Sequence, residues 1–405
     1  MTRTRFLLFL AIATTCVLGV KFYTARISEG VQESLPDKQA QSFDHAAECS
    51  IKTPDSMSEI SLQSNLARIA GQLIVVGFDG DAPTTHGAKQ VTRHLAEGLI
   101  SGVLLLGRNI SSQEQLKRLT RALSQPGIHP PFVMVDQEGG YIQRIRGFAS
   151  VDPVPSAKFV ATRLSVEQAE ALYGKLATQL ASVGINVNLG PVVDLNVNPS
   201  SPVIGKLERA FGSKPSVVTD YAGAFVRAHN AAGVLTALKH FPGHGSSGTD
   251  PHIVTNDITD TWDETELVPF RELIRRRLAD MVMTAHVILD KPPINTSGQA
   301  LSLSRNAIKN VLRKSLCFDG VVISDDLAMG AIKAEYSEEQ AAVEAIRAGN
   351  DIVLLAKSDD LAGLGPRINH ALVKEARNDA GFRERLRQAY SRVMLLKQRL
   401  QISGE

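Results

Sequence analysis

The sequence of 405 residues lacks an excess of charge of either sign, internal repeats and long hydrophobic runs. Its net charge of +2 gives no electrostatic reason to expect a nucleic-acid or acidic-polymer partner. No linker separates a second catalytic domain. With 43% hydrophobic and 21% charged residues, the composition is that of an ordinary globular protein, so extended disorder is not expected.

The apolar run from Phe6 to Val20 is short for a membrane span, which needs about 20 residues. Because Arg3 and Arg5 precede it, we interpret residues 1–25 as a signal peptide or signal anchor. Residues 26–57 form a polar spacer. We therefore expect an exported protein in the periplasm or another extracytoplasmic space, either released or attached to the inner membrane through its N-terminal segment.

Only two cysteines, Cys49 and Cys317, follow the N-terminal segment. An oxidising compartment would permit them to form a disulfide. However, Cys317 precedes a predicted core strand. We favour the alternative that it is a small buried hydrophobic residue.

Residues 58–405 alternate between short apolar runs and amphipathic segments. The runs with the length of buried strands are Leu73–Phe78, Gly102–Leu106, Pro131–Val135, Ile185–Leu189, Val234–Leu238, Met281–Ala285, Val321–Ile323 and Asp351–Leu355. The expected helices are His86–Glu97, Ser112–Leu123, Ser165–Ser182, Ser216–Ala232, Asp263–Leu278, Arg305–Leu316, Ser337–Ala348 and Asp379–Gln401. Strands that alternate with helices pair in parallel, so the pattern predicts an α/β fold with one (β/α)₈ TIM-type barrel and a C-terminal helix. An open doubly wound sheet is the alternative, but its glycine-rich turn is missing after the first strand.

Chemically active residues follow the ends of these strands. They are Asp136 and Glu138 after the third, Asp194 and Asn196 after the fourth, Lys239 and His240 after the fifth, His286 after the sixth, and Asp325 and Asp326 after the seventh. In a barrel all of these positions face one rim, where active sites are built. The stretch from Lys239 to His252 is the richest, because it contains three histidines, a lysine and an aspartate around Pro242, Gly243 and Gly245.

Two reactions suit this set. Metal-assisted hydrolysis would use His240, His244, His252, His286 and a carboxylate as ligands, but the first strand lacks His-x-His and the eighth lacks a following aspartate. Glycoside hydrolysis with retention needs a carboxylate nucleophile and a separate proton donor. Asp325 suits the first role because an apolar strand fixes its position. His252 suits the second, with Asp250 to orient its ring.

Four motifs resemble a known family: Lys-His-Phe-Pro-Gly-His-Gly-x-x-x-x-Asp-x-His, Asp-Gln-Glu-Gly-Gly, Glu-Arg-x-Phe-Gly and Ser-Asp-Asp-Leu. Together they resemble the β-N-acetylhexosaminidases of glycoside hydrolase family 3, of the single-domain NagZ type. The resemblance implies Asp325 as nucleophile, His252 as acid/base and Asp250 as its partner. It also implies sugar-binding roles, which fall on Asp136, Arg144, Arg209, Lys239 and His240.

The resemblance predicts a retaining exo-β-N-acetylglucosaminidase that acts through a covalent glycosyl-aspartate. Its partner would be a glycan with β-linked GlcNAc, such as a peptidoglycan fragment, and it would act as a monomer without metal or organic cofactor. Two alternatives remain open. One is a GlcNAc phosphorylase that uses the same site, and the other is a non-catalytic protein that binds envelope glycans.

Overall fold

The computed structural model describes residues 65–402, apart from residues 126, 128, 147–152 and 250–255. The predicted N-terminal segments, residues 1–25 and 26–57, lie outside this part of the chain. Within the described ranges, none of the helices combines the length and the apolar character that crossing a membrane requires.

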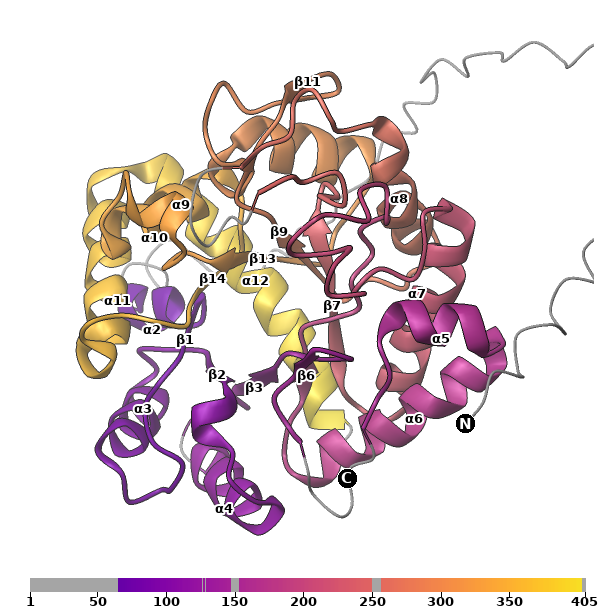
Figure 1. Cartoon of the computed structure of the whole chain (residues 1–405). Helices are drawn as coiled ribbons and strands as arrows, with labels where there is room; N and C mark the ends of the chain where they lie inside the picture. Colours follow the sequence, from indigo (N-terminus) through magenta and orange to yellow (C-terminus); the bar gives the residue numbers. More distant parts are fainter. Residues whose placement is uncertain (1–64, 126, 128, 147–152, 250–255, 403–405) are drawn as a thin grey trace, which may run out of the picture. The chain divides into compact units, whose positions relative to one another are not determined.

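Eight strands form a closed barrel (Figure 1). They are β1 (Ile74–Val76), β2 (Gly102–Leu105), β3 (Phe132–Val135), β6 (Val187–Asn188), β7 (Leu235–Phe241), β9 (Met281–Thr284), β13 (Val321–Asp326) and β14 (Ile352–Leu355). Each strand pairs in parallel with its two neighbours, and β1 closes the ring by pairing with both β2 and β14. The predicted (β/α)₈ barrel is therefore confirmed, and the open sheet is excluded.

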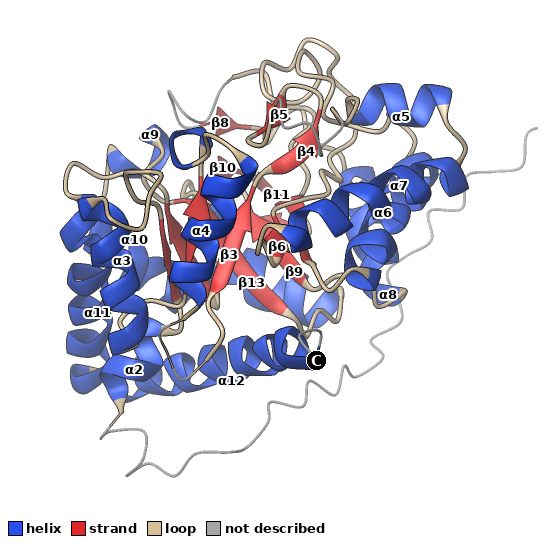
Figure 2. Ribbon diagram, turned by 90° about the horizontal axis from the view of Figure 1, so that it is seen from below, coloured by secondary structure: helices blue, strands red, loops and turns tan. Residues whose placement is uncertain are grey.

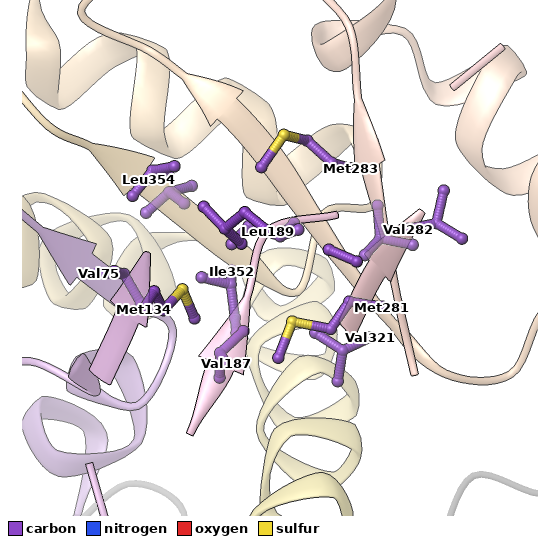
Figure 3. Close-up of a cluster of buried hydrophobic side chains, with 14 of the residues drawn as sticks. Val75, Met134, Val187, Leu189, Met281, Val282, Met283, Val321, Ile352 and Leu354 are labelled. Carbon is purple, nitrogen blue, oxygen red and sulfur yellow. The ribbon is translucent and has the colours of Figure 1, made fainter. Parts of the chain in front are cut away.

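The strands are apolar on both faces because one face lines the barrel and the other is covered by helices. Val75, Met134, Val187, Met281 and Ile352, which come from five different strands, are all buried. Figure 3 shows their side chains converging from the strands. This packing fixes the strand ends, from which the polar residues project.

Helices surround the barrel. The predicted ones are present as α3 (His86–Glu97), α4 (Gln113–Ser124), α6 (Val166–Ser182), α7 (Pro215–Ala231), η2 with α8 (Glu264–Leu267, Val268–Arg275), the π-helix η4 (Asn306–Ser315), α10 (Glu338–Ala348) and α12 (Ala380–Ile402). Capping boxes start α6 and α10: Ser165 pairs with Gln168 and Ser337 with Gln340. These two serines therefore fix where α6 and α10 begin.

The structure contains elements that the sequence pattern did not predict. They are the helices α2 (Leu66–Gly71), α5 (Ala157–Arg163), α9 (Gly330–Lys333) and α11 (Leu361–Asn378), and the short strands β4 (Gln137–Gly139), β5 (Ile142–Gln143), β8 (Asn256–Asp257), β10 (Val287–Ile288), β11 (Asp290–Lys291) and β12 (Ile294–Asn295). The two-residue strands are too short to show a period in the sequence.

Two further predictions need correction. The fifth strand does not end at Leu238, because β7 continues through Lys239 and His240 to Phe241. Cys317 is not a buried hydrophobic residue, since it is exposed and disulfide-bonded. Cys49, the possible partner considered from the sequence, lies outside the described residues.

Helix α12 crosses the end of the barrel where the strands begin, instead of covering the side wall (Figure 2). The ammonium group of Lys397 donates to the carbonyl of Ser101, just before β2, at 3.1 Å. Arg392 contacts Asp351, just before β14, and Arg399 contacts Asp280, just before β9. The barrel is thus closed by a helix at one end, and the opposite end is available for a site.

Candidate active site

The polar residues predicted to share a rim lie at the carboxyl ends of the strands. Asp136 follows β3 directly, Lys239 and His240 lie near the end of β7, His286 follows β9, and Asp325 lies near the end of β13. This is the end of the barrel away from α12 (Figure 2). The strands themselves therefore place these side chains in one region.

Lys239 lies at the centre of a buried ionic network. Its ammonium nitrogen is 2.8 Å from Asp136 Oδ1 and 2.7 Å from Glu138 Oε1, and the residue is only 2% exposed. Burial by itself would lower the pKa of Lys239, but Asp136 and Glu138 raise it above its ordinary value. Lys239 therefore remains a cation that can donate to a bound hydroxyl. Arg144 approaches the other oxygen of Asp136, at 3.5 Å.

Arg209 forms a two-point ion pair with Glu138, with 2.8 Å between Nε and Oε2 and between Nη2 and Oε1. Burial would raise the pKa of Glu138, but Arg209 and Lys239 hold it far below its ordinary value. The neighbouring Glu208 accepts hydrogen bonds from Ser156 and the ammonium group of Lys158. A surface pair between Arg209 and Glu208 is therefore not the role of this arginine.

His240 is oriented by Asp194, which is fully buried. His240 Nδ1 lies 2.7 Å from Asp194 Oδ2, while Asp194 Oδ1 accepts the backbone N–H groups of His240 and His244, each at 3.1 Å. Burial would raise the pKa of Asp194, but the two histidines lower it well below its usual range. One carboxylate thus fixes both the His240 ring and the loop after β7.

His244 has the environment of a structural residue. Its ring is buried and lies 4.6 Å from that of His240, and its Nδ1 is 3.1 Å from Ser247 Oγ. Burial lowers its pKa to about 4, so the ring is neutral near pH 7. This leaves it without the proton that a general acid must supply.

The ligand atoms of Asp194, His240 and His244 lie within 4.8 Å of one another, which is close enough to consider a metal ion. However, the His240 and Asp194 atoms are already joined by a hydrogen bond. The guanidinium of Arg209 also lies 3.4 Å from His240 Nε2, where its charge would repel a metal cation. The geometry favours a hydrogen-bonded cluster over a metal centre.

Asp325 presents a half-buried carboxylate at the end of β13, and its Oδ1 accepts the N–H of Asp326 at 2.8 Å. Burial would raise its pKa, but the nearby His240 and His286 lower it below its ordinary value, together with the Asp326 N–H and Lys239. Asp325 is therefore ionised at neutral pH, as a nucleophile must be.

His286 contacts residues of two neighbouring segments of the rim. Its Nδ1 lies 2.7 Å from Ser302 Oγ, and its Nε2 lies 3.1 Å from the carbonyl oxygen of Asp326. The ring is 1% exposed. A histidine at this position could line the pocket or support the rim, and these contacts favour support.

Two further carboxylates shape the site but received no role from the sequence. Burial raises the pKa of Asp326 to about 6, and this side chain accepts the N–H groups of Ala328 and Ala356. Burial also raises the pKa of Glu266 to about 7, and it accepts the N–H of Gly245 at 2.8 Å. Glu266 lies in η2, away from any strand end, so no positional signal could have identified it.

The predicted acid/base pair, Asp250 and His252, lies outside the described residues. The residues that flank this segment are joined, since Thr249 Oγ1 donates to Asn256 Oδ1 at 2.9 Å. Asn256 starts β8, which pairs with β10, and β10 directly follows His286. Asn256, the residue that follows this segment, therefore lies beside the loop after the sixth barrel strand, on the rim that holds Asp325.

A (β/α)₈ barrel with an ionised aspartate and paired, buried cations at its carboxyl-end rim has the features of a glycoside hydrolase. The model of the glycosyl hydrolase family 3 N-terminal domain matches residues 66–395. The chain belongs to this family and is a glycoside hydrolase.

Curated relatives of the chain are named as β-hexosaminidases. The β-hexosaminidase LpqI of Mycobacterium tuberculosis is 35% identical over 68% of this chain and 72% of its own length. The β-hexosaminidase A of Pseudoalteromonas piscicida is 35% identical over 63% of this chain, but the chain spans only 46% of it. Among solved structures, the β-N-acetylhexosaminidase of Beutenbergia cavernae matches with a TM-score of 0.73 and 31% identity, covering 82% of this chain and 98% of that one.

Proposed function

We propose that the protein is a retaining exo-β-N-acetylglucosaminidase that removes terminal GlcNAc through a covalent glycosyl-Asp325 intermediate. The observation that carries the proposal is the ionised Asp325 at the end of a packed strand, with Lys239, His240 and Arg209 grouped beside it. A binding protein has no need of a positioned nucleophile. The names of the relatives support β-linked GlcNAc as the sugar that is removed.

In the first step, Asp325 would attack the anomeric carbon while a proton moves to the departing oxygen. In the second step, water would attack the same carbon and release Asp325. One group must therefore donate a proton to the departing oxygen in the first step and accept a proton from water in the second. We assign this role to His252, with Asp250 as its partner, because His244 is neutral and buried and His286 is held by the rim.

The ionic network would bind the sugar. Lys239 and Arg209 remain charged because Asp136 and Glu138 compensate them, and charge-assisted hydrogen bonds to sugar hydroxyls are stronger than neutral ones. Since both cations are fixed before the substrate arrives, binding costs little side-chain entropy. Arg144 and His240 extend the same network.

We also propose that the substrate comes from the cell wall and that the protein is exported. The basic and apolar residues 1–25 support export, and so does the disulfide at Cys317, because such bonds persist in oxidising compartments. N-terminal sequencing of the mature protein from cell fractions would test both export and attachment to the inner membrane. An intact Met1 in a cytosolic fraction would contradict this part of the proposal.

The activity can be tested with p-nitrophenyl β-N-acetylglucosaminide and the matching β-glucoside, with and without phosphate and with a chelator. Selective release from the first compound, independent of phosphate and chelator, is the expected result. Release that requires phosphate would instead identify a phosphorylase. If the protein releases sugar from neither of these compounds and not from purified peptidoglycan fragments either, a glycan-binding protein would be favoured.

A further inference from the structure

A cavity of about 580 Å³ lies between η4, the end of α10 and the first half of α12. Seven basic side chains line it and only two acidic ones. We call it the basic pocket. Its volume is within the range of small-molecule sites.

The basic pocket is separate from the active site. The deepest carboxylate beside it, Asp351, directly precedes β14, and Arg313 donates to the carbonyl of Gly320, directly before β13. Both positions are at the amino ends of the strands, whereas Asp325 is at a carboxyl end. The glycosidase reaction therefore does not account for this concentration of charge.

Three guanidinium groups share a single carboxylate at the back of the basic pocket. Arg313, Arg385 and Arg392 all contact Asp351, which is completely buried. Burial and the neighbouring Arg392 and Arg385 lower the pKa of Arg313 to about 10, although Asp351 opposes this. Three guanidinium charges against the single charge of Asp351 leave an excess of two positive charges at the back of the basic pocket.

The two acidic residues that line the basic pocket pair with cations outside the Asp351 cluster. Asp379 is 2.8 Å from Arg347, which also lines the pocket and is therefore compensated, and Glu384 is 2.7 Å from Arg387 on its own helix. At the mouth, the exposed Arg305 and Lys309 make no ion pair with the described residues. The excess of positive charge thus extends from the back of the pocket to its mouth.

One donor at the back also lacks an acceptor. Arg385 Nη2 contacts Asp351 and the carbonyls of Gly349 and Asn350, but the buried Nη1 has no hydrogen-bond partner in the described part of the chain. A buried donor without an acceptor is destabilising, and a ligand oxygen would remove this cost.

We propose that the basic pocket binds a phosphate group, either of a phosphorylated small molecule or of a lipid headgroup. A phosphate monoester carries between about 1.5 and 2 negative charges near pH 7, which matches two guanidinium charges left over by Asp351. Its tetrahedral oxygens can accept from several guanidinium groups at once. A monocarboxylate brings only one charge and two oxygens.

The first test is calorimetric titration of the full chain with inorganic phosphate and, in parallel, with acetate. Saturable binding of phosphate but not acetate is expected. Arg385→Lys keeps the charge but removes Nη1, and it should weaken phosphate binding by about tenfold, the equivalent of one charge-assisted hydrogen bond. If wild-type protein binds no phosphate, the proposal is wrong.

Because Arg385 contacts the Asp351 cluster, a second variant avoids that cluster. Arg305→Ala/Lys309→Ala changes only exposed side chains at the mouth and should weaken phosphate binding several-fold while hydrolysis is unchanged. The matched control, Lys89→Ala/Arg121→Ala, removes two exposed cations from α3 and α4. Equal phosphate affinity in the mouth variant and this control would overturn the assignment to the basic pocket.

Sedimentation with vesicles distinguishes the two sources of phosphate. Binding to phosphatidylcholine vesicles that contain phosphatidic acid, lost in the mouth variant and competed by inorganic phosphate, would identify a lipid headgroup. Phosphate binding without vesicle binding would identify a soluble phosphorylated ligand.

Discussion

The guanidinium of Arg209 donates two hydrogen bonds, each 2.8 Å long, to the carboxylate of Glu138, which lies 71 residues earlier in the sequence. This pair joins the loop after β3 to the loop between β6 and α7. Lys239 from β7 contacts the same carboxylate, so three segments of the barrel rim are connected through Glu138. Glu138 is therefore a structural centre of the site, beside the proposed nucleophile Asp325.

Replacing Glu138 should therefore damage both stability and binding. Glu138→Ala leaves Arg209 without its carboxylate and Lys239 with Asp136 only, and breaking a buried ion pair costs about 3–5 kcal/mol. Urea denaturation measures the loss, and the KM for the glycoside should rise. Glu170→Ala removes an exposed partner of Arg227 and should cost less than about 1 kcal/mol. Equal losses in the two variants would contradict the central role of Glu138.

Asp325→Asn should abolish turnover, because an amide cannot form the glycosyl ester. A fall in kcat on the order of 10⁴-fold or more is expected, without a change in the free energy of unfolding larger than about 1 kcal/mol. The matched variant Asp326→Asn keeps an oxygen for the N–H groups of Ala328 and Ala356 and should retain most activity. Turnover by pure Asp325→Asn protein near the wild-type rate would require another nucleophile.

His252→Ala should show a dependence on the leaving group. General acid catalysis contributes about 10²–10⁴-fold when the departing oxygen is basic, so hydrolysis of a GlcNAc disaccharide should fall by that factor. Release of p-nitrophenolate needs no proton, so the first burst of this product should persist while the water step slows. A uniform loss with both substrates would argue against His252 as the acid/base.

The buried His229 should make stability depend on pH. Its ring lies against Phe225, and Nδ1 donates to the Phe225 carbonyl at 2.8 Å. Burial lowers its pKa to about 4 in the folded protein, against about 6.5 in the unfolded chain. Between these values only the unfolded chain takes up the proton, so His229 reduces the free energy of unfolding as pH falls from about 6.5 to 4, by at most about 1.4 kcal/mol per pH unit.

His229→Gln removes this titration, so its stability between pH 5 and 7 should fall less steeply on acidification than that of the wild type. Urea denaturation at intervals across this range is the measurement. Glu266, whose pKa rises to about 7, acts with the opposite sign, but it is present in both proteins and does not affect their difference. His370→Gln, at an exposed position of α11, is the matched control. Parallel pH profiles of His229→Gln and wild type would contradict the prediction.

The disulfide at Cys317 can be assigned by alkylation and mass spectrometry. We expect Cys317 to be unreactive before reduction in the wild type and reactive in Cys49→Ser, but still unreactive in Cys16→Ser. Loss of the bond should lower the free energy of unfolding by about 2–4 kcal/mol. A blocked Cys317 in the Cys49→Ser protein would point to a different partner.

Sequence periodicity predicted all eight barrel strands because each is a short apolar run that alternates with amphipathic helical segments along the chain. The same reasoning placed Asp136, Lys239, His240 and Asp325 on one rim, since parallel strands end together. It could not show that Arg209 pairs with Glu138 or that Asp194 orients His240, because these contacts join residues 71 and 46 positions apart in the chain. Nor could it place Glu266, which reaches Gly245 from a helix. Residue type and spacing carry no signal for such long-range pairs.

The pairing of β1 with β14 has a consequence for how the protein is made. These two strands are separated by almost the whole domain, and the helix that closes the barrel, α12, comes after both. A ribosome must therefore release nearly the complete chain before the ring can close. Until then β1 and β13 lack their β14 partner and leave backbone N–H and C=O groups unpaired, so we expect newly made chains to depend on holding factors during this interval.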